Sequence, residues 1–161
     1  MSDEIKVTVQ GLRPLMTMMY LAPELVTQEI TRAMRQSTLT IEGEAKHRVP
    51  VKTGTLRRSI HSEVRPISRG VEGLVGTITQ YAPYVEFGTG IYGPQKRPIV
   101  PRTKKALAWK SEGGEMIIRR SVRGMRPRPY LKPAFDAKLR EVEGFFRAAL
   151  KRVLGRLAHG R

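Results

Sequence analysis

Apolar residues recur three or four positions apart in two long stretches of this chain, residues 23–49 and 135–157. That spacing places them on one face of an α-helix and leaves polar residues on the other faces. The first stretch predicts a long amphipathic helix that ends before Pro50, because proline disfavours helical angles in the residue that precedes it. The second stretch predicts a basic C-terminal helix. The predicted buried positions are Leu25, Val26, Ile30, Ala33, Met34, Ser37, Ile41 and Ala45 in the first helix, and Phe135, Leu139, Val142, Phe146, Ala149, Leu150, Val153 and Leu157 in the second.

Alternating apolar and polar residues predict short strands between the helices. Residues 5–9 alternate in this way and predict a first strand, and the apolar residues 15–21 predict one or two helical turns. After the first long helix, Gly54 can adopt a positive φ angle and turn the chain into an extended run through Val64. A further strand is expected over residues 71–79, so that these two runs form a β-hairpin.

Two segments after this hairpin contain prominent glycines. Residues 81–89 are rich in aromatic residues and predict a short helical turn stopped by Gly88, with its aromatic side chains packed in the core. Residues 104–109 and 115–122 flank the sequence SEGG at 111–114, which predicts a second, basic β-hairpin.

Positive charge is concentrated toward the C-terminus of the chain. Residues 1–95 carry 11 Lys and Arg against 9 Asp and Glu, whereas residues 96–161 carry 19 against 5, so most of the formal charge of +16 lies in the second part. Within residues 96–128, 11 bases face only two acids. A solvated basic loop would look the same, but the length and charge of this segment favour a projecting arm at about residues 90–128.

Together these elements predict an α+β fold in a single domain over residues 1–161. A long N-terminal amphipathic helix and a C-terminal helix pack on a small, mostly antiparallel sheet, and a long basic β-hairpin forms the arm. The chain has no cysteine, which excludes disulfides, thiol nucleophiles and zinc sites that need thiolates. Its first residues lack a basic signal-peptide start, and no run of about 18 apolar residues occurs. We therefore expect a soluble protein made in the cytosol, with no membrane partner.

Three patterns resemble catalytic or ligand sites but lack the required context. Residues 88–93 read G-x-G-x-x-G, yet no strand precedes them and no helix follows, so their glycines are interpreted as a mobile hinge into the arm. His47, His61 and His159 are far apart and lack metal-ligand spacing. Ser59 lies near His61, but no third group orients such a pair. The sequence thus predicts no catalytic, cofactor-binding or metal site, and no enzyme.

Clustered bases favour contact with an anionic partner. Only Trp109 and Tyr130 could stack on bases near the arm, so sequence-specific reading of nucleic acid is not supported. A non-specific nucleic-acid-binding protein remains the alternative function, because backbone phosphates need only cations. The residues predicted to contact an oligomer neighbour, a partner protein or DNA are Lys104, Lys105, Arg119, Arg120, Arg123, Arg126 and Arg128.

Three sequence blocks occur in a fixed order: VPVKTGTLRRSI at 49–60, YAPYVEFGT at 81–89 and RPYLKPAF at 128–135. The chain closely resembles the neck or tail-completion proteins of long-tailed siphophages, a family of minor tail components that join head and tail. The pattern of this family is a proline, then T-G-x-L-x-x-S-I, then Y-A-x-Y-V-E-x-G-T, then Arg-Pro-aromatic before a final helix. Tyr130 stands where a phenylalanine is more usual.

The resemblance implies a virion structural protein without catalysis or cofactor. Copies would form a ring at the phage neck that completes the tail and joins it to the head connector around the DNA channel. A hexamer is favoured because such tail tubes are sixfold, and a dodecamer is the alternative. Implied partners are the adjoining head-connector and tail-terminator or tail-tube proteins, with non-specific contact to channel DNA as a second target. The protein would lie in the virion after assembly in the bacterial host cytoplasm.

Residues of the three blocks are interpreted as fold determinants first and contact residues second. Pro50 stops a helix, Gly54 allows a turn, and two prolines prepare the last helix. The full set comprises Pro50, Thr53, Gly54, Leu56, Ser59, Tyr81, Tyr84, Glu86, Gly88, Pro129, Tyr130 and Pro133.

Overall fold

A computed structural model describes residues 5–7, 23–68, 70–111 and 113–159. The chain divides into two compact units: unit 1 falls within residues 1–79 and 130–161, and unit 2 comprises residues 80–129. Helices and strands of unit 1 form an α+β arrangement, which confirms the predicted fold class. The predicted helical turns at residues 15–21 lie outside the described residues.

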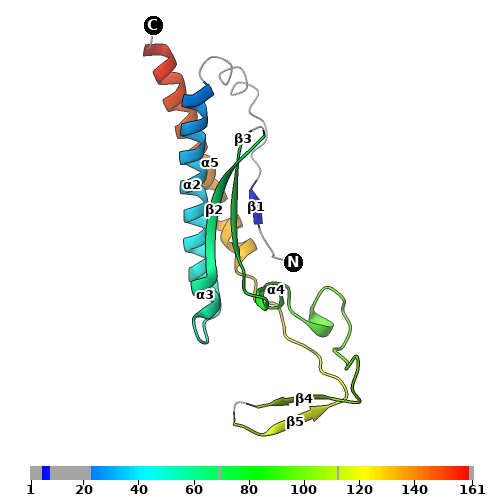
Figure 1. The fold of residues 1–161 in the computed structure, drawn as a ribbon. Helices are drawn as coiled ribbons and strands as arrows, with labels where there is room; N and C mark the ends of the chain where they lie inside the picture. The colour runs from blue at the N-terminus through cyan, green and yellow to red at the C-terminus, as the bar shows by residue number, and fades with distance from the viewer. Residues whose placement is uncertain (1–4, 8–22, 69, 112, 160–161) are drawn as a thin grey trace. The chain divides into compact units, whose positions relative to one another are not determined.

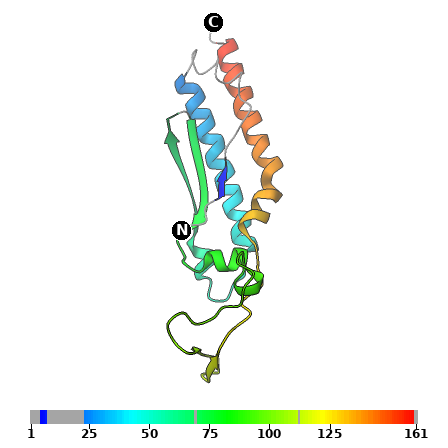
Figure 2. The same cartoon turned by 90° about the vertical axis from the view of Figure 1, so that its right-hand side faces the viewer.

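Two long helices dominate unit 1. Helices α2 (Pro23–Arg48) and α5 (Leu131–His159) lie side by side and run in opposite directions (Figures 1 and 2). Helix α2 contacts α5 and also contacts the sheet, so it forms the middle layer. The predicted face of α2 is confirmed, because Val26, Ala33, Met34, Ser37, Ile41 and Ala45 are buried.

The end of α2 and most of the buried positions of α5 agree with the sequence. Helix α2 ends at Arg48, one residue before buried Val49 and two before Pro50. In α5, Val142, Ala149 and Val153 are buried as predicted. Leu139 differs, since 40% of it is exposed. Leu139 has the spacing expected of the buried face of the helix. Apolar spacing does not show, however, how far along the helix neighbouring elements cover that face.

The sheet of unit 1 is antiparallel, with the order β1–β3–β2. Strands β2 (Ile60–Ile67) and β3 (Gly70–Thr77) form the predicted hairpin, and β1 (Ile5–Val7) pairs with the other side of β3. Strand β2 runs through Pro66, beyond the predicted end at Val64. Proline is tolerated there because β2 is an edge strand, where a missing N–H group need not break a ladder.

Strand β3 is buried on both faces. Glu72, Leu74 and Val75 are all buried. At Gly73 the strand approaches α2 so closely that a Cβ atom would lie 2.6 Å from both Met34 Sδ and Thr38 Cγ2. Glycine therefore allows the sheet to pack directly on the helix.

The turn after α2 contains a short helix that the sequence did not reveal. Gly54 adopts a φ angle of 76°, as predicted, but α3 (Thr55–Ser59) follows it in place of an extended run. Leu56 is buried, and the hydroxyl of Ser59 donates to the Leu56 carbonyl at 2.8 Å and lies 2.6 Å from the Thr77 hydroxyl. These contacts fasten the turn to the end of β3.

Replacing Gly54 with valine tests the role of this turn. A β-branched residue at positive φ is strained, so Gly54→Val is expected to lower the free energy of unfolding by about 1 kcal/mol. Arg120→Ala is the comparison, because Arg120 is exposed and its loss should change stability by less than about 0.5 kcal/mol. Thermal melting measures both variants. Equal melting temperatures would contradict the assignment of Gly54 to the fold.

Unit 2 begins with α4 (Ala82–Phe87), which ends at Gly88 with a φ angle of 75° as predicted. A 3₁₀ turn, η1 (Gly90–Tyr92), follows. Strands β4 (Leu107–Lys110) and β5 (Met116–Arg119) pair antiparallel, over shorter spans than those expected from the sequence. That this basic segment projects as an arm stays a prediction.

The glycines after α4 form a close backbone contact, where the sequence suggested a mobile hinge. The Thr89 amide donates to the Met125 carbonyl at 2.9 Å, and the Ile91 amide donates to the Arg123 carbonyl at 2.8 Å. A Cβ atom at Gly90 would overlap the Arg123 carbonyl oxygen. The glycines therefore let two chain segments meet, and hydrogen bonds hold them together.

Candidate functional site

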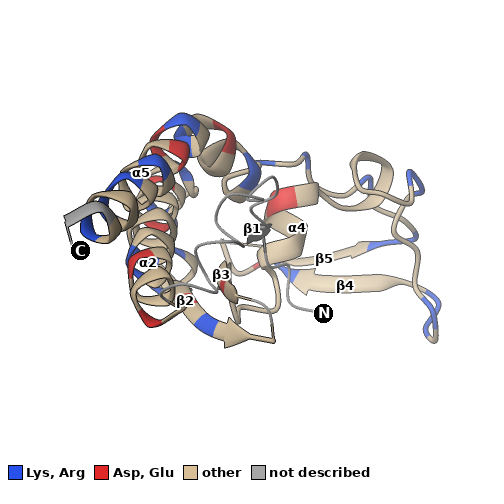
Figure 3. Ribbon diagram, turned by 90° about the horizontal axis from the view of Figure 1, so that it is seen from above, with Lys and Arg blue, Asp and Glu red and all other residues tan. Residues whose placement is uncertain are grey.

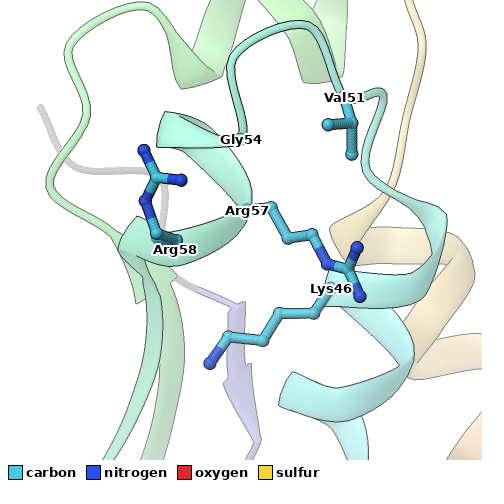
Figure 4. Close-up of a pocket in the computed structure, with 5 residues that line it drawn as sticks. All are labelled: Lys46, Val51, Gly54, Arg57 and Arg58. Atoms are coloured by element: carbon cyan, nitrogen blue, oxygen red, sulfur yellow. The ribbon is translucent and has the colours of Figure 1, made fainter.

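A cationic pocket lies at the turn between α2 and α3 in unit 1. It has a volume of about 460 Å³ and is lined by Lys46, Val51, Gly54, Arg57 and Arg58 (Figure 4). The sequence VPVKTGT reverses the chain after α2, and the positive φ of Gly54 lets α3 begin at once. Two consecutive arginines of α3 are thereby brought to the same pocket as a lysine from the last turn of α2.

Only part of the positive charge at this pocket is neutralised. Lys46 Nζ lies 2.5 Å from Glu42 Oε1, and the Ser62 hydroxyl donates to Glu42 Oε2 at 2.5 Å. Burial alone would raise the pKa of Glu42, but the hydrogen bonds from Lys46 and Ser62 outweigh it and hold that pKa below its usual range. Arg57 and Arg58 are exposed and form no ion pair within the described residues. Their guanidinium groups are available to an external anion.

Sequence reasoning did not select Arg57 or Arg58 as contact residues. It treated the block that contains them as a set of fold determinants. The available signal was the adjacent Arg-Arg pair directly after a turn and close to Lys46 and Lys52. Fold and contact roles are interleaved in this block, since buried Leu56 precedes the two exposed arginines.

A second surface, in unit 2, is an apolar groove with cations among its lining residues. Its volume is about 700 Å³. We call it the α4 groove, and its lining is Pro83, Tyr84, Phe87, Gly88, Thr89, Gly90, Gly93, Pro94, Gln95, Arg97, Pro98, Ile99, Val100 and Arg102.

The aromatic side chains of α4 lie at this groove and not in a core. Tyr84 is 57% exposed and Phe87 is 49% exposed, which corrects the expectation that the aromatics of residues 81–89 are core residues. Ala82 and Glu86, one helical turn apart, are the buried residues of α4. The helix therefore turns its small and acidic side chains inward and leaves its aromatic side chains accessible, because a four-residue repeat places Ala82 and Glu86 on one face.

The seven predicted contact residues are exposed, and all belong to unit 2. Arg119 ends β5, and the Arg126 guanidinium lies 5.4 Å from the ring centre of Tyr92, within the range of a cation–π interaction. None of the seven lines the α4 groove. The cations that do, Arg97 and Arg102, were not selected from the sequence.

The exposed face of α5 carries charges of both signs (Figure 3). Lys132 pairs with Asp136 at 3.0 Å, and Lys138 pairs with Glu141 at 3.1 Å. These local pairs neutralise part of the positive charge that the sequence assigned to the last helix. In unit 2, by contrast, no Lys or Arg of residues 80–111 and 113–129 forms an ion pair with a described carboxylate.

The residues considered for chemistry do not converge on a reaction site. His61 Nδ1 lies 3.0 Å from the backbone carbonyl of Ser59, while the Ser59 hydroxyl bonds with Thr77 and Thr79. Across residues 5–7, 23–68, 70–111 and 113–159, no group of three or more His, Asp or Glu side chains is arranged to hold a metal ion. The side chain of His159 lies outside the described residues. Among the described helices, none has the length and apolar character needed to cross a membrane.

Comparison with known families identifies one relationship. Residues 19–88 match a family model described as "Bacteriophage HK97-gp10, putative tail-component". The match confirms the resemblance to a phage tail-component family and supports a structural role in the tail. It includes the block at residues 49–60 and nearly all of the block at 81–89, while the block at 128–135 lies outside it. No curated protein and no solved structure matches the chain.

Proposed function

We propose that this tail component is a virion structural protein without catalytic activity, which forms a homo-oligomeric ring at the neck of a long-tailed phage. The ring completes the tail and joins it to the head connector around the DNA channel. The match of residues 19–88 to a phage tail-component family is the observation that carries the proposal. Assembly takes place in the cytoplasm of the bacterial host.

Exposed apolar side chains of unit 1 support burial by neighbouring copies. Leu39, Val51, Ile67 and Ile78 are large and exposed, and Ile78 is 80% accessible. In a closed ring, one face of each copy meets a different face of the next, so these residues need not lie in a single patch. A hexamer is favoured, with a dodecamer as the alternative. Adjoining head-connector and tail-terminator or tail-tube proteins would cover the two ends of the ring.

Electron microscopy of phage particles made without this gene tests the proposal. Heads and tails are expected to accumulate separately, and the tails should lack density at their upper end. Supplying the intact protein in the same cells should restore joined particles. Tails that form and join heads normally in its absence would refute the neck role.

Non-specific contact with DNA is the second candidate function. The exposed Lys104, Lys105, Arg119, Arg120, Arg123, Arg126 and Arg128 favour it, because cations bind phosphates without reading bases. Each phosphate contact should steepen the dependence of the binding constant on salt, with a logarithmic slope near −0.9. Binding to duplex DNA should therefore weaken strongly between about 50 and 200 mM salt. Unchanged binding over that range would contradict a role in DNA contact.

A further inference from the structure

We propose that the α4 groove binds an acidic, apolar peptide segment of an adjoining virion protein. The walls that carry the inference are Tyr84, Phe87, Ile99 and Val100, with Arg97 and Arg102 as the cations. Only the source of the segment, an adjoining virion protein, rests on the proposed tail role. The binding chemistry follows from the groove itself.

The walls present large apolar side chains to solvent. Val100 is 57% exposed, Phe87 and Tyr84 are about half exposed or more, and Ile99 is also accessible. Pro83, Pro94 and Pro98 lie among them and offer no backbone N–H group. A groove of about 700 Å³ with such walls gains most from apolar side chains, since their transfer from water is favourable.

The charges at the groove select an acidic occupant. Arg97 and Arg102 are exposed and make no ion pair among the described residues. Unit 2 carries eleven Lys and Arg against three Asp and Glu, a net charge of +8. A second copy of this chain, itself +16, would meet the groove with like charge. A carboxylate-bearing partner is attracted and can form bidentate contacts with either guanidinium.

Backbone hydrogen bonds hold the chain segments that form the α4 groove in place. Binding of a peptide therefore does not have to order these segments. The Arg128 amide donates to the Val85 carbonyl at 2.7 Å, which fixes α4 against the returning chain. Ile99 and Val122 exchange two backbone hydrogen bonds, of 2.9 and 3.0 Å. The Lys96 amide closes a turn on the Gly93 carbonyl at 3.0 Å. Such pre-organisation lowers the entropic cost of capturing a flexible segment.

The apolar walls favour a peptide over DNA. Nucleic acid would place phosphates against the side chains of Val100, Ile99 and three prolines, which carry no hydrogen-bond donor. The exposed cations predicted from the sequence to contact DNA, including Lys104 and Arg120, do not line the groove. A peptide that alternates carboxylates with apolar side chains matches both features of the α4 groove.

The test measures binding of a short fluorescein-labelled peptide, in which Glu alternates with Leu and Phe, to the full chain by fluorescence anisotropy. Val100→Glu places a carboxylate on the apolar wall and is expected to weaken binding at least tenfold. Ile118→Glu is the matched control: it introduces the same charge at an exposed apolar residue of β5, outside the groove. It should change affinity by less than about threefold, because charges away from a site are screened.

A second pair of measurements separates the groove from general charge attraction. Tyr84→Ala removes an exposed wall residue without adding charge and should weaken the Leu/Phe peptide. A matched peptide of Glu and Ser should bind more weakly, and equally well to the parent and to Tyr84→Ala. Circular dichroism verifies that each variant keeps its helical content, which exposed positions should allow.

Four outcomes, besides an absence of peptide binding, would overturn the proposal. Equally reduced affinity of the Leu/Phe peptide for Ile118→Glu and for Val100→Glu would show a charge effect alone. Equal binding of both peptides would remove the role of the apolar walls. Loss of self-association in Val100→Glu, measured by analytical ultracentrifugation, would assign the groove to a second copy. Loss of duplex DNA binding in Tyr84→Ala would assign it to nucleic acid.

These results are independent of the ring. The peptide is measured on the isolated chain, so absent binding refutes the groove and leaves the neck role standing. Binding by a chain whose loss does not affect phage assembly refutes the neck role and leaves the groove standing.

Discussion

Replacing Gly73 with alanine is expected to lower the free energy of unfolding of unit 1 by about 2 kcal/mol, because the added methyl group overpacks the contact between β3 and α2. The Cβ atom would lie 2.6 Å from Met34 Sδ and from Thr38 Cγ2, closer than van der Waals contact allows. Met34 and Thr38 are both buried and have little room to move. Urea unfolding, followed by the helical circular dichroism signal of α2 and α5, measures the loss.

Gly43→Ala provides the matched control for Gly73→Ala. Gly43 lies within α2, and apart from its chain neighbours and the adjacent backbone of its own helix no described atom lies within 4 Å of the position that a Cβ atom would occupy. Alanine should therefore stabilise the helix there, by about 0.5–1 kcal/mol. The same substitution is thus expected to have opposite signs at the two sites. Stabilisation at Gly73 would show that the sheet does not rest on the helix as closely as described.

Replacing Glu29 with glutamine is expected to lower the free energy of unfolding by about 2 kcal/mol at neutral pH, since a charge-assisted hydrogen bond between the two long helices is lost. Glu29 lies on α2 and is only 4% exposed. Its Oε2 atom accepts a hydrogen bond from Arg152 Nε at 2.6 Å, and Arg156 lies 3.5 Å from Oε1. Arg152 is partly exposed, so solvent limits the loss.

The effect of Glu29→Gln should depend on pH. The hydrogen bond from Arg152 holds the pKa of Glu29 below its usual range, against the opposing effect of burial. A carboxylate whose pKa is lower in the folded state stabilises the fold above its unfolded pKa, near 4.3 for glutamate. That stability is lost as the pH falls through the folded pKa. The difference in the free energy of unfolding between the parent and Glu29→Gln should therefore be largest at pH 7 and become smaller below about pH 4.

Glu143→Gln is the control for the ion pair of Glu29 with Arg152, which joins the two long helices. Glu143 also lies on a long helix and pairs with Arg147, but at 3.6 Å and with both side chains exposed. Such surface pairs contribute little, so the variant should lose less than about 0.5 kcal/mol at any pH. Urea unfolding at pH 7 and at pH 3 compares the parent with both variants. A pH-independent loss in Glu29→Gln would indicate that packing, and not the ion pair, is responsible.

The elements predicted well are those with long local patterns. Helix α2 begins at Pro23 and ends before Pro50, because each proline acts on the residues beside it and the apolar spacing repeats every three or four positions between them. Helix α3 was missed because five residues are too few to show a helical period. The glycines after α4 were interpreted as a hinge because the segment that packs against them lies more than thirty residues later in the chain. The hydrogen bond between Thr89 and Met125 shows this separation.

The cationic pocket and the α4 groove differ in how far the sequence indicated them. Arg57 and Arg58 stood in a recognisable block, but their pocket depends on the turn that brings Lys46 beside them. Tyr84 and Phe87 were visible as aromatic residues and were assigned to the core. A short helix has too few positions to reveal which face is covered, so their exposure could not be predicted from spacing.

The sequence by itself determined the two long helices, the first hairpin, the concentration of positive charge and the likeness to a phage tail-component family. Each of these depends on local order or composition. The tertiary structure decided which residues approach across long separations, since Glu29 meets Arg152 and Gly73 meets Met34. It also decided which apolar side chains stay exposed, as at the walls of the α4 groove. Such contacts depend on how distant segments pack, and local periodicity carries no information about that packing.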